Sequence, residues 1–218
     1  MDDGPVGAPA DTIHVAVVDD RQATRRLLAA HVASTPAIGH VTVPQGANGR
    51  HAVLLRFTAR PPDEQVVNGR MPLGDGLFAI EHIRYRERAR GLPRIPIVIA
   101  SAWPATLERA LLAGADAAIP YPPTRHWTWA VVRWVLGHPS PDPPGGDRGP
   151  EPDPAVAAFD AVRNHLPAGI PVRGLMAWFF TANPRLGTRP IDRVGDLDAL
   201  LAAARAEADA EKRVDPAG

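Results

Sequence analysis

Short apolar runs alternate with segments of helical periodicity over the first part of the chain. The runs, which suit strands covered on both faces of a sheet, span residues 13–18, 41–43, 65–68, 95–100 and 117–119. Between them, the spacing of apolar residues predicts helices over residues 22–33, 50–58, 76–88, 105–113 and 125–136. The alternation predicts an α/β fold with a doubly wound, five-stranded parallel sheet over residues 13–137. The functional crevice of such a sheet lies beyond the carboxyl ends of its strands.

Proline and glycine interrupt this pattern over residues 138–154. Proline lacks a backbone donor and glycine loses much entropy on ordering, so we expect a semi-extended linker there. Helical patterns resume and predict a second, small all-α domain over residues 155–210, in which Phe159, Leu175 and Trp178 contribute to apolar stripes. We expect the two ends of the chain, residues 1–12 and 211–218, to be disordered.

Composition narrows the classes of function. The 24 basic and 24 acidic residues cancel, so binding to nucleic acid or an anionic membrane requires a local patch. The absence of cysteine excludes disulfides, thiolate catalysis and Cys-ligated zinc. No apolar run approaches the roughly 18 residues of a membrane span, and residues 1–12 do not resemble a signal peptide. We therefore expect a cytoplasmic protein that does not enter a membrane.

Polar side chains follow the predicted strands at the points where the strands end. They are Asp19 and Asp20, Asn68, Ser101 and Tyr121. Because the carboxyl ends of parallel strands meet at one edge of a sheet, we expect these side chains to form a polar rim. Asn68 is the central member, since two valines precede it and a Met-Pro step and a glycine-rich turn follow it.

The motifs around this rim resemble those of the receiver domain of response regulators, the CheY-like, flavodoxin-like fold. The matching segments are Val17-Val18-Asp19-Asp20, residues 66–72 with Asp75-Gly76, residues 97–102, and Ala113-Gly114-Ala115-Asp116 leading to Pro122. The resemblance covers the first 137 residues. It implies a signalling domain that takes part in a phosphorelay of a two-component system.

The resemblance also implies a role for each rim position, and three of the family's functional positions have changed in this chain in the direction of disabling phosphotransfer. The phosphoacceptor position is Asn68, whose amide is not a nucleophile of carboxylate strength. The phosphate-binding lysine is replaced by Tyr121, and Ala118 stands where the family has an aromatic switch residue. Ser101 keeps the hydroxyl that contacts the phosphoryl group. We therefore expect a pseudo-receiver that is not phosphorylated at this rim.

The acidic pair Asp19 and Asp20 holds a divalent cation in the family that the chain resembles. With a neutral amide at Asn68, the resemblance implies at most weak binding of Mg²⁺. The alternative is a pair of solvated carboxylates left over from the fold. No cofactor is required by either interpretation.

Three tryptophans, Trp127, Trp129 and Trp134, lie on the predicted helix over residues 125–136. A helix turns by about 100° per residue, so the three cannot all face one core. The core alone accounts for one or two of them. We expect the remainder to lie in an interface with a partner or under the linker, and a homodimer through this helix is one such interface.

The segment after the linker resembles the toxin-binding domain of the Xre/MbcA/ParS-like antitoxins. The residues that carry this resemblance are Trp178, Asn183, Pro184, Leu186, Gly187 and Pro190. It implies a protein partner, either a toxin of the matching family or another signalling protein. A helical cap without a partner is the alternative. The apolar segment 172–180 does not resemble a DNA-recognition helix, so nucleic-acid binding is not favoured.

Three functions remain after these steps. The first is a non-enzymatic regulatory protein that couples a pseudo-receiver to a protein-binding, antitoxin-like module. The second is a response regulator that controls transcription through a DNA-binding output domain. The third is a working phosphorelay receiver that uses Asp19 or Asp20 as its acceptor. The sequence contains no catalytic constellation, nucleophile elbow or phosphate-cradling loop, so we do not expect an enzyme.

Overall fold

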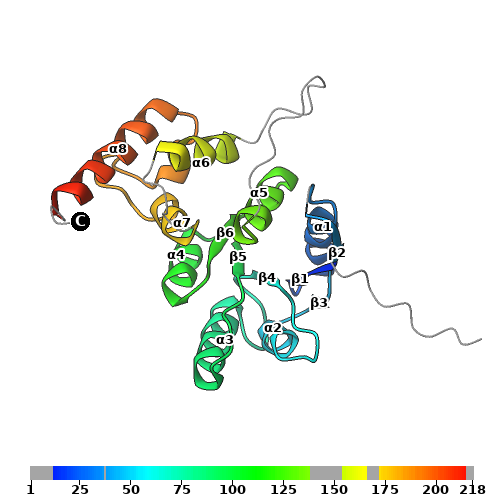
Figure 1. Cartoon of the computed structure of the whole chain (residues 1–218). Coiled ribbons are helices and arrows are strands. Elements are labelled where there is room, and N and C mark those ends of the chain that lie inside the picture. Colours follow the sequence, from blue (N-terminus) through cyan, green and yellow to red (C-terminus); the bar gives the residue numbers. More distant parts are fainter. Residues whose placement is uncertain (1–11, 37, 138–153, 166–171, 215–218) are drawn as a thin grey trace, which may run out of the picture.

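The computed structural model describes residues 12–36, 38–137, 154–165 and 172–214. The predicted ends at residues 1–11 and 215–218 lie outside these ranges, as does almost all of the predicted linker. A parallel sheet forms the centre of the fold, with helices on both of its faces (Figure 1). Its strands are β1 (Thr12–Val18), β2 (His40–Thr42), β3 (Gln45–Gly46), β4 (Glu64–Asn68), β5 (Ile97–Ser101) and β6 (Ala117–Pro120).

The strand order β2-β1-β4-β5-β6 confirms the predicted parallel α/β sheet. One difference occurs at the edge, where two short strands, β2 and β3, both pair with β1. Pro44 separates them, and its missing N–H interrupts the ladder of hydrogen bonds. Its carbonyl still accepts a bond of 2.9 Å from the N–H of Val17. The two strands therefore lie together at one edge of the sheet, where the sequence predicts a single strand.

Each predicted helix is present. The helices are α1 (Gln22–Ala33), α2 (Gly49–Arg56), α3 (Gly76–Arg90), α4 (Pro104–Ala113), α5 (Arg125–Val135), α6 (Pro154–His165), α7 (Val172–Phe180) and α8 (Leu197–Val214), with a short 3₁₀-helix, η1 (Pro190–Arg193). Figure 1 shows α1 and α5 on one side of the sheet and α2 and α3 on the other. Helix α8 continues past the predicted start of the tail at residue 211, as far as Val214.

The start of α3 illustrates how the sequence sets a helix end beside the rim. The side chain of Asp75 accepts a hydrogen bond of 2.8 Å from the N–H of Phe78, which satisfies one of the free donors of the first turn. A Cβ at Gly76 would lie 2.5 Å from the carbonyl oxygen of Asn68. Only glycine permits this close approach between α3 and the end of β4.

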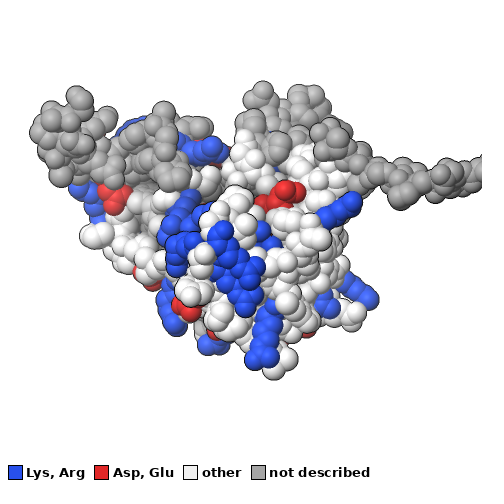
Figure 2. Space-filling model, turned by 60° about the horizontal axis from the view of Figure 1, so that its bottom comes forward, with Lys and Arg blue, Asp and Glu red and all other residues white. Residues whose placement is uncertain are grey.

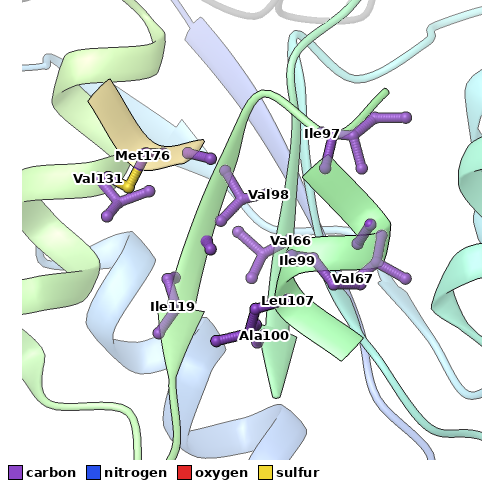
Figure 3. Packing of buried hydrophobic residues seen from close by; sticks show 14 of the residues in the cluster. Val66, Val67, Ile97, Val98, Ile99, Ala100, Leu107, Ile119, Val131 and Met176 are labelled. Carbon is purple, nitrogen blue, oxygen red and sulfur yellow. The ribbon is translucent and has the colours of Figure 1, made fainter. Parts of the chain in front are cut away.

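The core of the sheet consists of the fully buried strands β4 and β5 with their neighbours (Figure 3). Val66, Val67 and Ile99 are inaccessible to solvent. The same cluster extends beyond the sheet, because Met176 of α7 packs in it together with Val131 of α5. The apolar core is thus continuous between the α/β part of the chain and the helices that follow residue 153.

Aromatic rings make the contact between α5 and α6. Phe159 stacks on Trp134 with ring centroids 4.0 Å apart, and it meets the edge of Trp127 at 6.0 Å. Phe179 of α7 lies 5.2 Å from Phe159 on its other side. At the end of α4, the Arg173 guanidinium donates a hydrogen bond of 3.0 Å to the carbonyl of Leu111. Helices α6 and α7 therefore cover the side of the fold formed by α4, β6 and α5.

These contacts place two of the three tryptophans of α5 in the core of the chain, and an interface between this helix and another molecule stays a prediction. Trp127 and Trp134 are buried beneath α6. Trp129 is half-buried and donates a hydrogen bond of 2.8 Å from its indole nitrogen to the carbonyl of His31 in α1. The helix turns its tryptophans in different directions: Trp127 and Trp134 face α6, and Trp129 faces α1.

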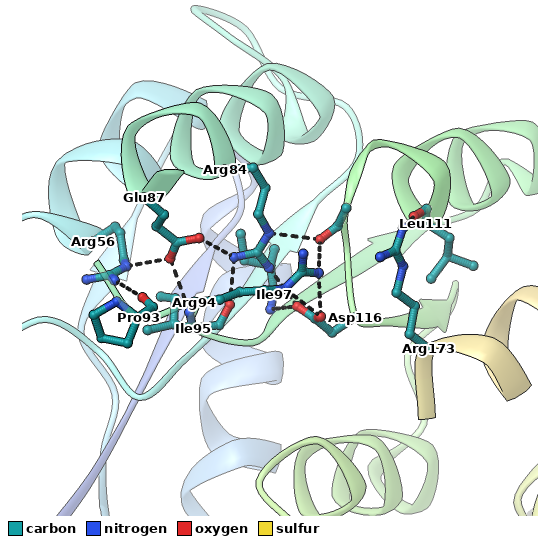
Figure 4. Close-up of polar contacts among 11 residues, drawn as sticks. Arg56, Arg84, Glu87, Pro93, Arg94, Ile95, Ile97, Leu111, Asp116 and Arg173 are labelled. Atoms are coloured by element: carbon teal, nitrogen blue, oxygen red, sulfur yellow. Dashed lines mark hydrogen bonds and ion pairs between the residues drawn. The ribbon is translucent and has the colours of Figure 1, made fainter. Parts of the chain in front are cut away.

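A buried network of ion pairs joins α2 and α3 to the ends of β5 and β6 (Figure 4). Glu87 accepts bonds from Arg56 at 2.8 Å and from Arg84 at 2.6 Å. Arg84 also binds Asp116 at 2.6 Å, and Asp116 binds Arg94 at the same distance. The network lies at the amino ends of β5 and β6, at the end of the sheet opposite the rim.

No helix among the described residues is long and apolar enough to cross a membrane.

Candidate functional site

The parallel sheet brings the predicted rim residues to its carboxyl edge. Asp19 directly follows β1, Asn68 ends β4 and Ser101 ends β5. The sheet register pairs Asn68 with Ala100 and Ser101 with Pro120, next to Tyr121. Asp19 and Ser101 are buried, while Asp20 is exposed. The strands therefore gather the five predicted side chains at one place.

Tyr121 and Asp19 form the inner pair of the rim. The Tyr121 hydroxyl donates a hydrogen bond of 2.7 Å to Oδ2 of Asp19, and the Arg21 N–H donates one of 2.8 Å to Oδ1. Burial raises the pKa of Asp19, although the bonds from Tyr121 and Arg21 oppose that rise. Burial and the bond to Asp19 raise the pKa of Tyr121, so the tyrosine keeps its proton. Both carboxylate oxygens of Asp19 are thus occupied by donors from the chain itself.

Asn68 and Asp20 form the outer pair. The Asn68 side-chain amide donates bonds of 3.1 Å to Oδ1 of Asp20 and 3.0 Å to the carbonyl of Arg70. Its oxygen accepts from the Arg70 N–H at 3.3 Å. A carboxylate at this position would face Asp20 as a like charge, whereas the amide donates to it. Asn68 and Asp20 are therefore joined by a hydrogen bond and do not repel each other.

Ser101 lies deep in the rim, against backbone. Its Oγ accepts a hydrogen bond of 3.2 Å from the N–H of Trp103. A Cβ at Gly69 would approach this oxygen to 3.1 Å, so the glycine keeps room for the hydroxyl. Above it, the Arg70 guanidinium lies 4.8 Å from the ring centroid of Trp103, which is 56% exposed. We did not predict a role for Arg70 and Trp103 at the rim. The position of Trp103 two residues after the end of a strand was the available signal.

The fit of the rim to Mg²⁺ depends on how many oxygens are free. Mg²⁺ prefers near-octahedral coordination by hard oxygens. The carboxylate of Asp19 accepts from Tyr121 and Arg21, and Asp20 accepts from Asn68. Within the described ranges, no group of three or more His, Cys, Asp or Glu residues is arranged to hold a metal ion. The rim in this conformation does not fit a tightly bound divalent cation.

The residues that carry the antitoxin resemblance build a turn between α7 and α8. Asn183 is its organising residue, because its backbone pairs with Thr188 and its side-chain oxygen accepts from the N–H of Arg185 at 2.9 Å. Glu207 of α8 accepts bonds from the indole of Trp178 and from the Asn183 amide. Gly187 adopts a positive φ of 68°, and the buried Pro190 begins η1. Pro184, next to Asn183, is exposed.

A groove of about 360 Å³ lies beside this turn. It is lined by Arg185, Leu186, Arg193 and four alanines of α8, Ala199, Ala202, Ala203 and Ala206. Of the six residues predicted to bind a partner, only Leu186 faces this groove. The arginines and alanines were missed because single alanines and scattered arginines carry no local signal.

Comparisons with known proteins bear on the α/β part of the chain. No protein-family model matches the sequence, and the curated proteins contain no match. A chain from the complex of the Saccharomyces cerevisiae phosphotransfer protein Ypd1 with the receiver domain of Ssk1 is 19% identical, with a TM-score of 0.51. The match covers 57% of this chain and 89% of that one.

Two further solved structures are similar. A chain of the CheX-CheY-BeF3-Mg complex from Borrelia burgdorferi is 23% identical, with a TM-score of 0.50. The match covers 57% of the present chain and 89% of the Borrelia chain. The signal receiver domain of NarL from Mycobacterium tuberculosis is 26% identical, with a TM-score of 0.49. The match covers 59% of the present chain and 99% of the NarL domain. Over somewhat more than half of its length, the chain therefore has the fold of a response-regulator receiver domain.

Proposed function

We propose that the protein is a non-enzymatic regulator in which a phosphorylation-independent receiver carries a helical protein-binding module. The observation that supports this most directly is the hydrogen bond from Tyr121 to Asp19. A neutral phenol stands where a cation would be needed to stabilise a phosphoryl group. It also holds the carboxylate on which a metal site would depend. The rim is therefore stable without a phosphoryl group or an ion.

The amide of Asn68 supports the same proposal. The side-chain N–H groups of Asn68 donate to Asp20 and to the carbonyl of Arg70. An amide also does not form an acyl phosphate by nucleophilic attack. We infer that the rim maintains one conformation of its loops and does not switch between two.

Phosphotransfer provides the test. The protein is incubated with acetyl phosphate and Mg²⁺, and its intact mass is measured. We expect no stable gain of phosphate in the wild-type protein or in Asn68→Ala. The double variant N68D/Y121K restores both the carboxylate and the cation, and we expect it to be labelled. Labelling of the wild-type protein that maps to Asp19 or Asp20 would instead support the working phosphorelay receiver.

The partner-binding part of the proposal concerns α7, α8 and the turn between them. The groove beside Leu186 offers both apolar and charged contacts, because four alanines and two arginines line it. The apolar side of α7 is buried, including Leu175, Met176 and Phe179, which supports protein binding over insertion of this helix into DNA. The chains of known structure named above include complexes with protein partners, Ypd1 and CheX. We propose a protein partner here, either a toxin of the matching family or another signalling protein.

Co-purification with the products of neighbouring genes tests this part. We expect a complex that is weakened by Leu186→Asp, which places a carboxylate in the groove. Leu112→Asp is the matched control, because Leu112 is 77% exposed on α4 and does not line the groove. A specific complex with duplex DNA, without any protein partner, would favour the transcription regulator.

A further inference from the structure

Arginines gather on the face that α2 and α3 present to solvent (Figure 2). Arg86, Arg88 and Arg90 lie on α3, and Arg60 follows α2; all four are exposed. None of these four guanidinium groups makes an ion pair with any residue that the structure describes. We call these residues, with Phe57 and Leu54, the α2–α3 surface.

Phe57 organises the guanidinium groups of this surface. The centres of the Arg86 and Arg90 groups lie 5.6 Å and 5.2 Å from its ring centroid. Arg56 lies 5.4 Å from the same ring, but its own donors are used by Glu87 and by the carbonyl of Pro93. Contact with a ring restrains a guanidinium while leaving its N–H groups free for an anion. Arg86 and Arg90 are thus partly pre-organised.

The acidic residues near this surface make no ion pair with its arginines. Glu87 is buried between Arg56 and Arg84, and Asp116 binds Arg84 and Arg94. Glu81 is exposed on α3 and makes no ion pair with any residue that the structure describes. Arg86 and Arg90 are four positions apart on one helix, where like charges repel. The chain as a whole has a formal net charge of zero. The positive charge here is therefore a local patch that the fold itself does not need.

An apolar side chain close to Phe57 indicates the kind of anion. Leu54 on α2, one turn before Phe57, is 64% exposed. Arginine is enriched at protein interfaces, and guanidinium groups bind carboxylates in a bidentate manner. A surface for a phosphate backbone would not need exposed leucine. We propose that the α2–α3 surface binds an acidic protein segment whose carboxylates pair with Arg86 and Arg90 and whose apolar side chains contact Leu54.

This surface is separate from both the rim and the groove of the helical module, so its failure would leave the proposed function standing. The test measures binding of a fluorescent synthetic peptide rich in glutamate and leucine, a duplex DNA, and vesicles that contain phosphatidylserine. The variants are R86E/R90E and R86Q/R90Q; the second keeps long, neutral side chains if charge reversal prevents folding. The control R109E/R205E makes the same change of charge at exposed positions on α4 and α8. Circular dichroism verifies the fold of each variant.

We expect saturable binding of the peptide that weakens by about tenfold or more in the two variants of Arg86 and Arg90, which corresponds to about 1.4 kcal/mol. The control pair should remain within about twofold, a change of roughly 0.4 kcal/mol. Absence of saturable peptide binding, an equal loss in the control, or tighter binding to DNA or vesicles than to the peptide would each overturn the proposal.

Discussion

Oη of Tyr121 and Oδ2 of Asp19 lie 2.7 Å apart and share a hydrogen bond across the buried end of the sheet. Asp19 is completely inaccessible to solvent, so the tyrosine hydroxyl supplies the hydrogen bond that water cannot supply to this oxygen. The pair joins the end of β1 to the segment after β6, on opposite sides of β4 and β5. It therefore contributes to stability as well as to the chemistry of the rim.

Removal of this hydroxyl should destabilise the protein in a pH-dependent manner. Tyr121→Phe leaves a buried carboxylate oxygen without its donor, and we expect a loss of about 1–3 kcal/mol in the free energy of unfolding. The bond stabilises ionised Asp19, so the loss should be full at neutral pH and shrink once Asp19 is protonated in acid. Urea titrations at neutral and at acidic pH measure this loss in the free energy of unfolding. Tyr85→Phe is the matched control, since Tyr85 is exposed; an equal effect there would contradict the assignment.

Glu64 should make the protein less stable as pH rises. It is fully buried at the start of β4, and neither of its carboxylate oxygens has a hydrogen-bond partner among the described residues. Burial, and secondarily the charge of Asp116, raise its pKa well above the ordinary value of 4.5. The unfolded chain releases this proton at lower pH than the folded protein does. The free energy of unfolding therefore falls as pH rises from the ordinary pKa toward the raised one.

Glu64→Gln removes this proton and should remove that slope. We expect the stability of the variant relative to wild type to increase from acidic to neutral pH, as measured by denaturant titrations across this range. Glu81→Gln, at an exposed position of α3, serves as the control. A constant difference between Glu64→Gln and wild type at all pH values would show that Glu64 is not protonated in the folded protein.

Glu87 should show the opposite dependence. Burial raises its pKa, but hydrogen bonds from Arg56 and Arg84 outweigh burial and hold the pKa below the ordinary value. Its contribution is present above the ordinary pKa and is lost as pH falls through the lowered one. Glu87→Gln leaves the buried guanidinium of Arg56 without its anion and that of Arg84 with Asp116 alone, and we expect a loss of about 3–5 kcal/mol at neutral pH. Thermal unfolding at neutral and acidic pH would reveal a smaller gap in acid; a gap that grows in acid would refute this account.

Phe159 should hold α6 against the tryptophans of α5. Its ring is inaccessible to solvent and stacks on Trp134. Phe159→Ala leaves a cavity, and we expect a loss of about 3–5 kcal/mol together with a shift of tryptophan emission to longer wavelength. Leu112→Ala removes an apolar side chain that is 77% exposed and should change neither quantity appreciably. Unchanged emission in Phe159→Ala would mean that α6 does not cover Trp134 in solution.

The order of the strands and helices could be predicted from the sequence because two different periodicities alternate along it. The pattern predicted one strand over residues 41–43, whereas the structure has β2 there and a further short strand, β3, after Pro44. The position of the tryptophans was harder to predict. Helical spacing predicts that the three turn in different directions, and Trp129 faces α1 while the other two face α6. That α6 covers Trp127 and Trp134 could not be predicted, because no local pattern shows which face a distant helix will cover.

At the rim, residue types could be predicted and pairings could not. The spacing of motifs placed Asp19, Asn68, Ser101 and Tyr121 at one edge of the sheet. Which oxygen receives the tyrosine hydroxyl, and that Asn68 donates to Asp20, depend on side-chain rotamers and on contacts between distant segments. The same holds for the α2–α3 surface. Arg86, Arg88 and Arg90 alternate along one short segment, but only the packing of α3 beside Phe57 brings Arg86 and Arg90 to one ring.

The aromatic contact between α5 and α6 has a consequence for how this protein can be divided. A fragment that ends at residue 137 would keep every strand of the sheet, yet it would expose Trp127 and Trp134 to water. Such a fragment should tend to self-associate. Because the apolar core is shared, we expect the sheet and the C-terminal helices to unfold as one cooperative unit. Exchange of either part with a relative would need compensating changes at Trp134 and Phe159.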